Sequence, residues 1–255
     1  MTVVVKIGGR AAEDRGRLKE LCVEMSELSG RLGFILVHGG GAEVTAVSKA
    51  LGMEAVFKNG VRQTTAAEMD VVDMVLSGKV NSALVRLCRC CGIDAVGLSG
   101  SDGGICLGKR MTGMPADSRT GEVAEVRTRL LELLLSKGFM PIVSPASMDA
   151  VGNGLNINAD DAAFAVARAL SAHALIFLSD IPGVLKGGEV IGKLTGSQGR
   201  ECIEAGDITG GMIPKVTASL QAISGGVSNV IIGQYDHAGA LADLLEGRAG
   251  TRICA

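Results

Sequence analysis

Short apolar runs that end in glycines alternate with helical sequence along this chain. The first two runs, VVVKIGG at 3–9 and FILVHGGG at 34–41, have the character of buried strands. Between them, apolar residues recur at the spacing of one helical face: Leu18, Leu21, Cys22, Met25, Leu28 and Leu32. The chain is therefore predicted to begin with a β-α-β unit, in which the two strands are parallel.

The same alternation continues to the C-terminal end. We expect further helices at 66–76, 79–91, 128–137, 159–170, 213–224 and 238–246, and strands at 93–99, 140–144, 174–179 and 229–232. This pattern predicts an α/β fold, a three-layer αβα sandwich around a mostly parallel central sheet. In such folds, ligands bind at the carboxyl ends of the strands.

Two polar, glycine-rich segments, 101–125 and 183–207, are predicted to be hairpins or loops inserted between these elements. A boundary near residue 172 divides the chain into two lobes, 1–172 and 173–255, although the sheet can continue across it. The boundary is therefore a soft one.

The composition favours small-molecule chemistry. With a net charge of −2, no Trp and one Tyr, the chain lacks the basic surface and stacking aromatics of nucleic-acid-binding proteins. Its apolar runs are shorter than the ~20 residues of a membrane span, and its N-terminus shows no secretory signal. Neither nucleic acid nor membrane is expected as a partner, and a cytoplasmic location is expected. The 37 glycines, about twice the usual ~7%, indicate that backbone approaches a ligand.

Seven cysteines make an odd number, and CRCC at 88–91 lies in helical sequence, where adjacent side chains point in different directions. Buried free thiols are therefore favoured over disulfides or a metal site.

The common nucleotide-binding templates do not fit. In SGKVN, Lys79 is followed by Val80 where a Walker A loop requires Ser or Thr, and GGGAEV has Val44 at the sixth position of the dinucleotide fingerprint. A phosphoryl-transfer enzyme without these loops still needs cations on both sides of the transferred group.

Two lysines suit that task. Lys6 interrupts an apolar strand, where a charge is costly unless it faces a site, and Lys215 follows ITGGMIP at the start of a predicted helix. A third candidate lies in LNINADDAA at 155–163, where Asn156 and Asn158 share a strand face and Asp160 begins a helix. Each residue also has a purely structural explanation. Lys6 could lie on an edge strand, Lys215 could lie in a surface loop, and Asp160 could be a helix N-cap.

Seven motifs, taken together and in this order, resemble the amino acid kinase family over nearly the whole chain. They are KIGG at 6–9, VHGGG at 37–41, NGVRQT at 59–64, GLSGSDGG at 97–104, NINAD at 156–160, LSDIPGVL at 178–185 and GGMIPK at 210–215. The resemblance is greatest to the members that phosphorylate N-acetyl-L-glutamate in arginine biosynthesis. It implies the carbamate kinase-like fold and ATP-dependent phosphorylation of a side-chain carboxylate, with an acyl phosphate as the product.

The resemblance also implies residue roles. Lys6 and Lys215 would stabilise the transition state from opposite sides, and Asp160 would hold both lysines in position. The lobe 1–172 would bind the amino acid, and the residues implied in substrate binding are Gly40, Gly41, Arg62, Asn156 and Asn158. Arg62 would hold the α-carboxylate, because its planar fork matches a carboxylate, and Asn156 would hold the acylamino group.

For the nucleotide, the resemblance implies backbone contacts to the phosphates from Gly8, Gly9 and Gly40. The lobe 173–255 would bind ATP through Asp180, Ile181, Gly183, Val184 and Leu185, and then through Asp207, Ile208 and Thr209. Mg²⁺ would arrive with ATP, bound mainly by phosphate and water, so no metal ligands are assigned to the protein.

The segment VLKGGEVIGKLT is short and contains Lys186, which leaves the adenine contacts open. The arginine-inhibited members of the family have an additional N-terminal helix that links dimers into hexamers. Because this sequence begins almost directly at its first strand, a homodimer is expected.

Two other functions remain open at this point. One is a sister kinase that phosphorylates aminoadipate, or glutamate, bound to an acidic carrier protein. The other is a non-catalytic amino acid sensor with the same fold, against which the presence of both lysines and Asp160 argues.

Overall fold

The computed structural model describes residues 1–8, 14–58, 61–208 and 212–254. Within these residues, an eight-stranded sheet has the order β14-β16-β15-β11-β1-β2-β8-β5. Six neighbouring strands are parallel, whereas β16 is antiparallel to β15 and β14 pairs parallel with β16. The strands are β1 (Thr2–Ile7), β2 (Gly33–His38), β5 (Ala95–Ser99), β8 (Met140–Ser144), β11 (Ala174–Leu178), β14 (Lys193–Thr195), β15 (Val230–Gly233) and β16 (Thr251–Cys254).

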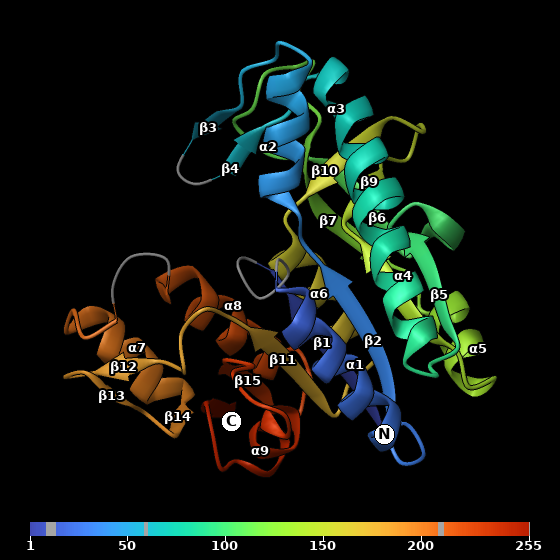
Figure 1. Cartoon of the computed structure of the whole chain (residues 1–255). Helices are drawn as coiled ribbons and strands as arrows, with labels where there is room; N and C mark the ends of the chain where they lie inside the picture. The colour runs from blue at the N-terminus through green and yellow to red at the C-terminus, as the bar shows by residue number, and fades with distance from the viewer. Residues whose placement is uncertain (9–13, 59–60, 209–211, 255) are drawn as a thin grey trace.

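Helices cover both faces of this sheet (Figure 1). One apolar cluster joins the sheet to α1 (Arg15–Leu28), α4 (Asn81–Cys90) and α9 (Ala240–Glu246). A second cluster joins the opposite face to α5 (Arg129–Ser136), α6 (Ala159–Ala169) and α8 (Met212–Ser224). The predicted three-layer αβα architecture is confirmed.

The two faces of β1 explain the place of Lys6. Val3 and Val5 pack with α1, whereas Val4 packs in the cluster that contains α6 and α8. Because side chains alternate along a strand, Lys6 shares the face of Val4. Its neighbours in the sheet are the apolar residues Phe177 and Val37. The Lys6 ammonium group therefore needs a charged partner from the helices that pack on this face, α6 and α8.

A smaller β unit lies beyond the carboxyl ends of β1 and β2, at the upper end of the molecule in Figure 1. Its four strands close on themselves: β6 (Cys106–Arg110), β7 (Thr120–Val126), β9 (Ala146–Met148) and β10 (Gly154–Ile157). A hairpin of β3 (Val56–Lys58) and β4 (Val61–Gln63), α2 (Gly41–Ala50) and α3 (Ala66–Val72) complete this end. The segment 101–125 is thus the β6–β7 hairpin, as expected.

The structure differs from the sequence-based expectations in two segments. A π-helical stretch, Asp73–Val80, joins α3 directly to α4, so the two expected helices form one rod. The segment 183–207 is more ordered than expected, since it contains the hairpin of β12 (Leu185–Lys186) and β13 (Glu189–Val190), then β14 and α7 (Gly196–Glu204). Short strands and polar helices of this kind give little hydrophobic periodicity.

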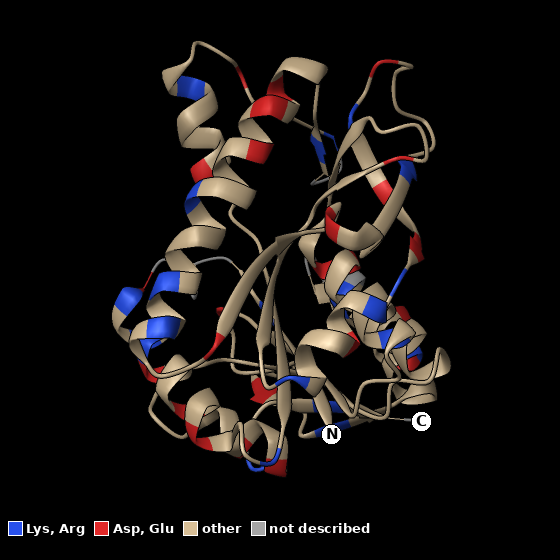
Figure 2. Cartoon of the chain, turned by 90° about the vertical axis from the view of Figure 1, so that its right-hand side faces the viewer, with Lys and Arg blue, Asp and Glu red and all other residues tan. Residues whose placement is uncertain are grey.

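The sheet continues across the predicted lobe boundary, because β11 pairs with β1. Acidic and basic residues are interspersed over the helices of the side shown in Figure 2, in keeping with the net charge of −2. Among the described residues, no helix combines the length and the apolar character that crossing a membrane requires.

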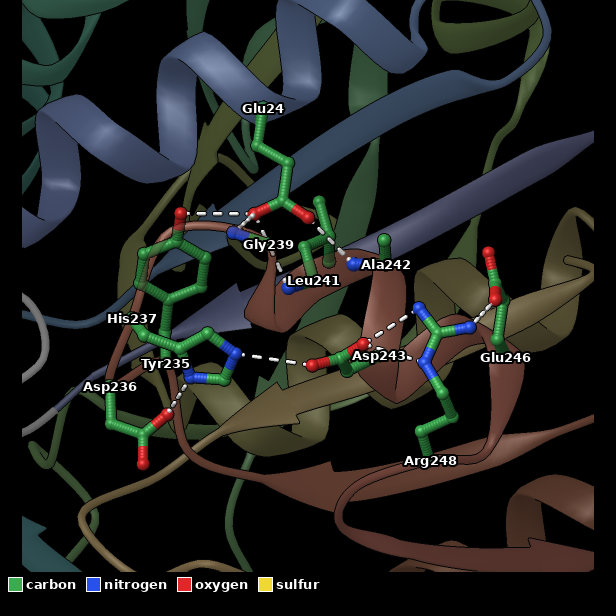
Figure 3. A network of polar contacts seen from close by, with 10 residues as sticks. All are labelled: Glu24, Tyr235, Asp236, His237, Gly239, Leu241, Ala242, Asp243, Glu246 and Arg248. Carbon is green, nitrogen blue, oxygen red and sulfur yellow. Dashed lines mark hydrogen bonds and ion pairs between the residues drawn. The ribbon is translucent and has the colours of Figure 1, made fainter.

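A buried carboxylate ties α1 to the C-terminal part of the chain (Figure 3). Glu24, only 7% exposed, accepts hydrogen bonds from the backbone N–H groups of Gly239 (3.1 Å), Leu241 (3.3 Å) and Ala242 (2.7 Å). The Tyr235 hydroxyl donates a fourth, at 3.0 Å. Burial, followed by the hydrogen bond to Glu24, raises the pKa of Tyr235 above its usual range. Glu24 therefore caps α9, whose own N-cap, Gly239, has no side chain to do so.

We predict that Glu24→Gln lowers the free energy of unfolding by about 2–3 kcal/mol, because an amide nitrogen would face N–H donors and the charge-assisted bonds would be lost. Urea denaturation measures this loss. Glu27→Gln, on the exposed side of the same helix, is the control and should change stability by about 0.5 kcal/mol or less. Equal effects of the two substitutions would contradict the capping role.

Candidate functional site

The carboxyl ends of β1 and β2 open into a cavity of about 270 Å³. Its walls come from the N-termini of α2 and α6, from β4 and from β10. Eight of the predicted site residues line it together: Lys6, Gly8, Gly40, Gly41, Arg62, Asn156, Asn158 and Asp160. Residues distant in sequence meet here because parallel strands end at one edge of the sheet.

One carboxylate holds both predicted lysines. Asp160 Oδ1 forms an ion pair with Lys6 Nζ at 2.6 Å, and Asp160 Oδ2 accepts a hydrogen bond from Lys215 Nζ at 2.9 Å. Lys6 comes from β1, Asp160 from the first turn of α6 and Lys215 from the first turn of α8. Lys215 Nζ also lies 5.8 Å from the centre of the Phe177 ring. Two ammonium groups on one carboxylate leave a net positive charge at the cavity.

The protonation state of Asp160 follows from these contacts. Burial raises the pKa of its carboxyl, but the charges of Lys6 and Lys215 and their hydrogen bonds outweigh burial, so the pKa lies below its usual value. Asn158 is the N-cap of α6, since its side chain accepts from the Asp160 N–H at 2.7 Å. Asp160 is therefore not the cap, and it stays ionised at neutral pH.

The glycine turn after β2 forms another wall. Gly40 has φ of 146°, which L side chains rarely adopt, and an added Cβ would lie 2.8 Å from Leu76. Gly8 lies opposite, and an added Cβ there would collide with the Lys6 ammonium. Gly40 thus requires glycine for its backbone conformation, whereas a side chain at Gly8 would displace the Lys6 ammonium group. Gly9 falls outside the described residues.

Arg62 is held on several sides. Its guanidinium donates to the Gly41 carbonyl oxygen at 3.0 Å and to the Thr45 hydroxyl, and stacks 4.7 Å from the Phe57 ring centre. Glu68 Oε1 lies 3.8 Å from Nη1. Among the described residues, buried Nη1 has no hydrogen-bond partner, and neither has the buried Glu68 Oε1 with which it forms the ion pair.

Burial lowers the pKa of the Arg62 guanidinium, against the opposing charge of Glu68, but an arginine remains protonated. Glu68 is itself buried and forms a capping box with Thr65 at the start of α3. The pattern T-x-x-E in the sequence marks this cap, but its contact with Arg62 depends on the fold.

His38 forms a hydrogen bond to the glycine turn, a contact that the sequence did not predict. It is fully buried; Nδ1 donates to the Gly39 carbonyl oxygen at 2.8 Å and Nε2 accepts from Asn81 Nδ2 at 3.1 Å. Burial lowers its pKa to about 4. The imidazole is therefore neutral, and its two nitrogens act as one donor and one acceptor.

The nucleotide residues predicted in the lobe 173–255 lie away from this cavity, unlike Gly8 and Gly40. None of the described ones among Asp180–Leu185, Asp207 and Ile208 lines the cavity described above. Lys186 joins the two segments through a 2.8 Å ion pair with Asp207. Leu185 is exposed, Ile181 and Asp207 are half-buried, and Asp180 is exposed. Thr209 lies outside the described residues.

Three of these residues are buried: Gly183, Val184 and Ile208. The side chains of Val184 and Ile208 are buried in the core. The Val184 N–H donates to the Thr251 hydroxyl at 2.8 Å, and its carbonyl accepts from the Ile191 N–H at 2.8 Å. If this segment binds a nucleotide, the contacts would therefore come from the exposed backbone and side chains around Val184.

Residues 1–234 match the model of the amino acid kinase family. The chain belongs to this family. It is 41% identical over 256 residues to the acetylglutamate kinase of Chlorobaculum tepidum, covering 99% of this chain and 90% of that one. It is 42% identical over 260 residues to the acetylglutamate kinase of Nostoc sp., covering 99% and 87% of the two chains.

Solved structures agree on the fold. The chain superposes on smu.665 of Streptococcus mutans with a TM-score of 0.79 at 28% identity, covering 100% of this chain and 98% of that one. The carbamate kinase of Giardia lamblia bound to AMP-PNP matches with a TM-score of 0.70 at 17% identity, over 99% of this chain and 98% of that one. At that identity, the likeness supports the predicted carbamate kinase-like fold alone.

We predict that His38 makes stability fall in acid. Because its folded pKa of about 4 lies below the ordinary histidine value of 6.5, the unfolded chain binds the proton first. This contribution to stability is present above pH ~6.5 and is lost as the pH falls to ~4, by up to ~3 kcal/mol. In urea titrations at successive pH values, His38→Gln should flatten the curve in this window. Exposed His173→Gln is the control and should run parallel to the original chain; a parallel His38→Gln curve would contradict the prediction.

Proposed function

We propose that this chain transfers the γ-phosphoryl group of ATP to the side-chain carboxylate of N-acetyl-L-glutamate, a step of arginine biosynthesis. The observation that carries the proposal is the placement of Lys6 and Lys215 on the two oxygens of Asp160, at the edge of a cavity. The relatives named acetylglutamate kinase, 41% and 42% identical over nearly the whole chain, support the same acceptor.

The two lysines match the charge that this reaction develops. A carboxylate oxygen of the acceptor forms a bond to the γ-phosphorus while the bond to the β-phosphate bridging oxygen breaks, and negative charge spreads over the phosphoryl group. Lys6 and Lys215 come from different elements and are fixed by one anion, so their positive charges are in place before the reaction. Asp160 is a positioning group in this scheme, since its lowered pKa makes it a poor proton carrier at neutral pH.

The acceptor fits the other wall of the cavity. Arg62 lines the cavity, and its planar fork matches the α-carboxylate of an amino acid. Asn156 from β10 would receive the acylamino group, and the turn at Gly40 and Gly41 allows the acceptor close to the backbone. Asn158 contributes chiefly by capping α6 and so orienting Asp160.

ATP is the donor in this proposal. Gly8 and Gly40 border the cavity where phosphates would lie, and the segments around Asp180–Leu185 and Asp207 remain the proposed nucleotide residues, together with Gly9 and Thr209. Across the described part of the chain, no three His, Cys, Asp or Glu side chains are grouped to hold a metal ion. The proposal therefore assigns Mg²⁺ to phosphate oxygens and water.

The proposal includes a homodimer in the cytoplasm. All seven cysteines lie in described positions and are free thiols, in keeping with a reducing compartment. Sedimentation equilibrium of the purified chain tests the dimer.

The acceptor assignment predicts that ATP and N-acetyl-L-glutamate give an acyl phosphate, trapped by hydroxylamine as a hydroxamate. Unacylated glutamate should react poorly, because polar groups placed for the acylamino group would lose their partners, at about 1–3 kcal/mol each. Product from carrier-bound aminoadipate but none from N-acetyl-L-glutamate would replace the acceptor and leave the phosphoryl chemistry standing. No ADP release with any acceptor would favour a sensor.

The catalytic assignment predicts that Lys6→Met and Lys215→Met each lower kcat by roughly 10²–10³-fold, the typical loss for one transition-state donor. Exposed Lys137→Met is the control and should keep the original kcat. Asp160→Asn should also lower kcat, because an amide holds two ammonium groups poorly. Thermal melting of the four variants separates a catalytic loss from a loss of folding, and near-normal turnover of either lysine variant would remove that lysine from the mechanism.

A further inference from the structure

A buried hydroxyl contacts the side chain proposed to hold the acylamino group. Asn156 Nδ2 donates to Thr64 Oγ1 at 2.9 Å, and Thr64 is 1% exposed. Asn156 belongs to β10, whereas Thr64 directly follows β4, 92 positions earlier in the sequence. Thr64 is absent from the cavity wall, so it would reach a ligand only through Asn156.

A second buried hydroxyl continues the connection to the arginine. The Thr64 N–H donates to Thr120 Oγ1 at 2.9 Å, and Thr120 Oγ1 donates to the Arg62 carbonyl oxygen at 2.9 Å. Thr120 also lies opposite Asn156 in the β7–β10 pairing. Two backbone hydrogen bonds of Arg119 also connect these strands. The Arg119 N–H donates to the Thr64 carbonyl oxygen at 2.7 Å, and the Arg119 carbonyl oxygen accepts from the Asn156 N–H at 2.8 Å.

The chemistry of an amide makes this contact decisive for recognition. An asparagine side chain presents a donor at one end and an acceptor at the other, and rotation by half a turn exchanges them. With Nδ2 bound to Thr64, the opposite end of the Asn156 amide is Oδ1, an acceptor. An acceptor suits the N–H of an acylamino group, whereas the exchanged orientation would place N–H against N–H.

We propose that Thr64 is a positioning residue that fixes the Asn156 amide with its oxygen toward the acceptor, and that Thr120 sets the distance between this oxygen and Arg62. The site then selects a molecule whose α-carbon carries both an N–H donor, for Asn156, and a carboxylate, for Arg62. This inference rests on the proposed function, because Asn156 and Arg62 are its acceptor-binding residues.

Three variants test the role. Thr64→Val replaces the hydroxyl by a methyl group of similar size and removes the acceptor for Nδ2. Thr64→Ser keeps the hydroxyl and is the conservative variant. Thr128→Val is the matched control, because Thr128 precedes α5 and does not cap it with its side chain.

The first readout needs no substrate. In a ¹H–¹⁵N spectrum of the full chain, assigned with Asn156→Asp, the two Nδ2 protons should be well separated because one is hydrogen-bonded to Thr64. Thr64→Val should bring the two proton shifts together, whereas Thr64→Ser and Thr128→Val should keep them apart. An unchanged spectrum in Thr64→Val would overturn the inference, whichever acceptor the enzyme uses.

The second readout is kinetic. Thr64→Val should raise the KM for N-acetyl-L-glutamate about fivefold to tenfold, as expected for one misplaced hydrogen bond. The KM for ATP and kcat should change by less than about twofold, and Thr64→Ser should restore the acceptor KM. Equal loss in Thr64→Val and Thr64→Ser, or a fall in kcat that follows a lower melting temperature, would show a structural role and overturn the inference.

The two failures are distinguishable. If the unmodified chain makes no hydroxamate from N-acetyl-L-glutamate, the proposed function fails, and the amide spectrum alone then decides the role of Thr64. If the chain does make the product and Thr64→Val has an unchanged acceptor KM, the proposed function stands and the positioning role is wrong.

Discussion

The carboxylate of Asp160 is the interaction on which the site depends. Lys6 lies on a buried strand between Phe177 and Val37, where an unpaired ammonium group would be unfavourable. Asp160 satisfies it and also binds Lys215, so one residue of α6 connects a strand with a second helix. The cluster retains a net positive charge, because two ammonium groups share one anion. A buried group of this kind is weak evidence for stability but suits a site that receives phosphate.

The glycine turn after β2 has a backbone conformation that L side chains rarely adopt. Gly40 adopts a positive φ and leaves no space for a Cβ beside Leu76. His38, neutral and fully buried, supports the same turn from the other side by accepting from Asn81 and donating to Gly39. Packing against Leu76 and the hydrogen bonds of His38 thus determine the turn, and its glycines line the cavity.

The two halves of the proposed chemistry differ in how far the structure assembles them. The residues proposed for the acceptor, Arg62, Asn156 and the glycine turn, line one cavity. The proposed nucleotide segments lie apart, and the Lys186–Asp207 ion pair holds them to each other rather than to the cavity. Burial of Val184 and Ile208 leaves backbone and exposed neighbours as the groups that could meet a nucleotide.

The sequence alone determined the α/β class and most helix and strand positions, because hydrophobic period is a local signal. It also predicted Lys6, as a charge in an apolar strand, and Lys215, at a helix start, as site residues. It also indicated that Asp160 and Arg62 belong to a site, through the order of the motifs. Only the tertiary structure decided that Asn158 rather than Asp160 caps α6, that Glu68 lies beside Arg62, and that Thr64 contacts Asn156. The physical reason is that these contacts join strands and helices far apart in the chain, and no residue spacing encodes a distance between elements that meet only after folding.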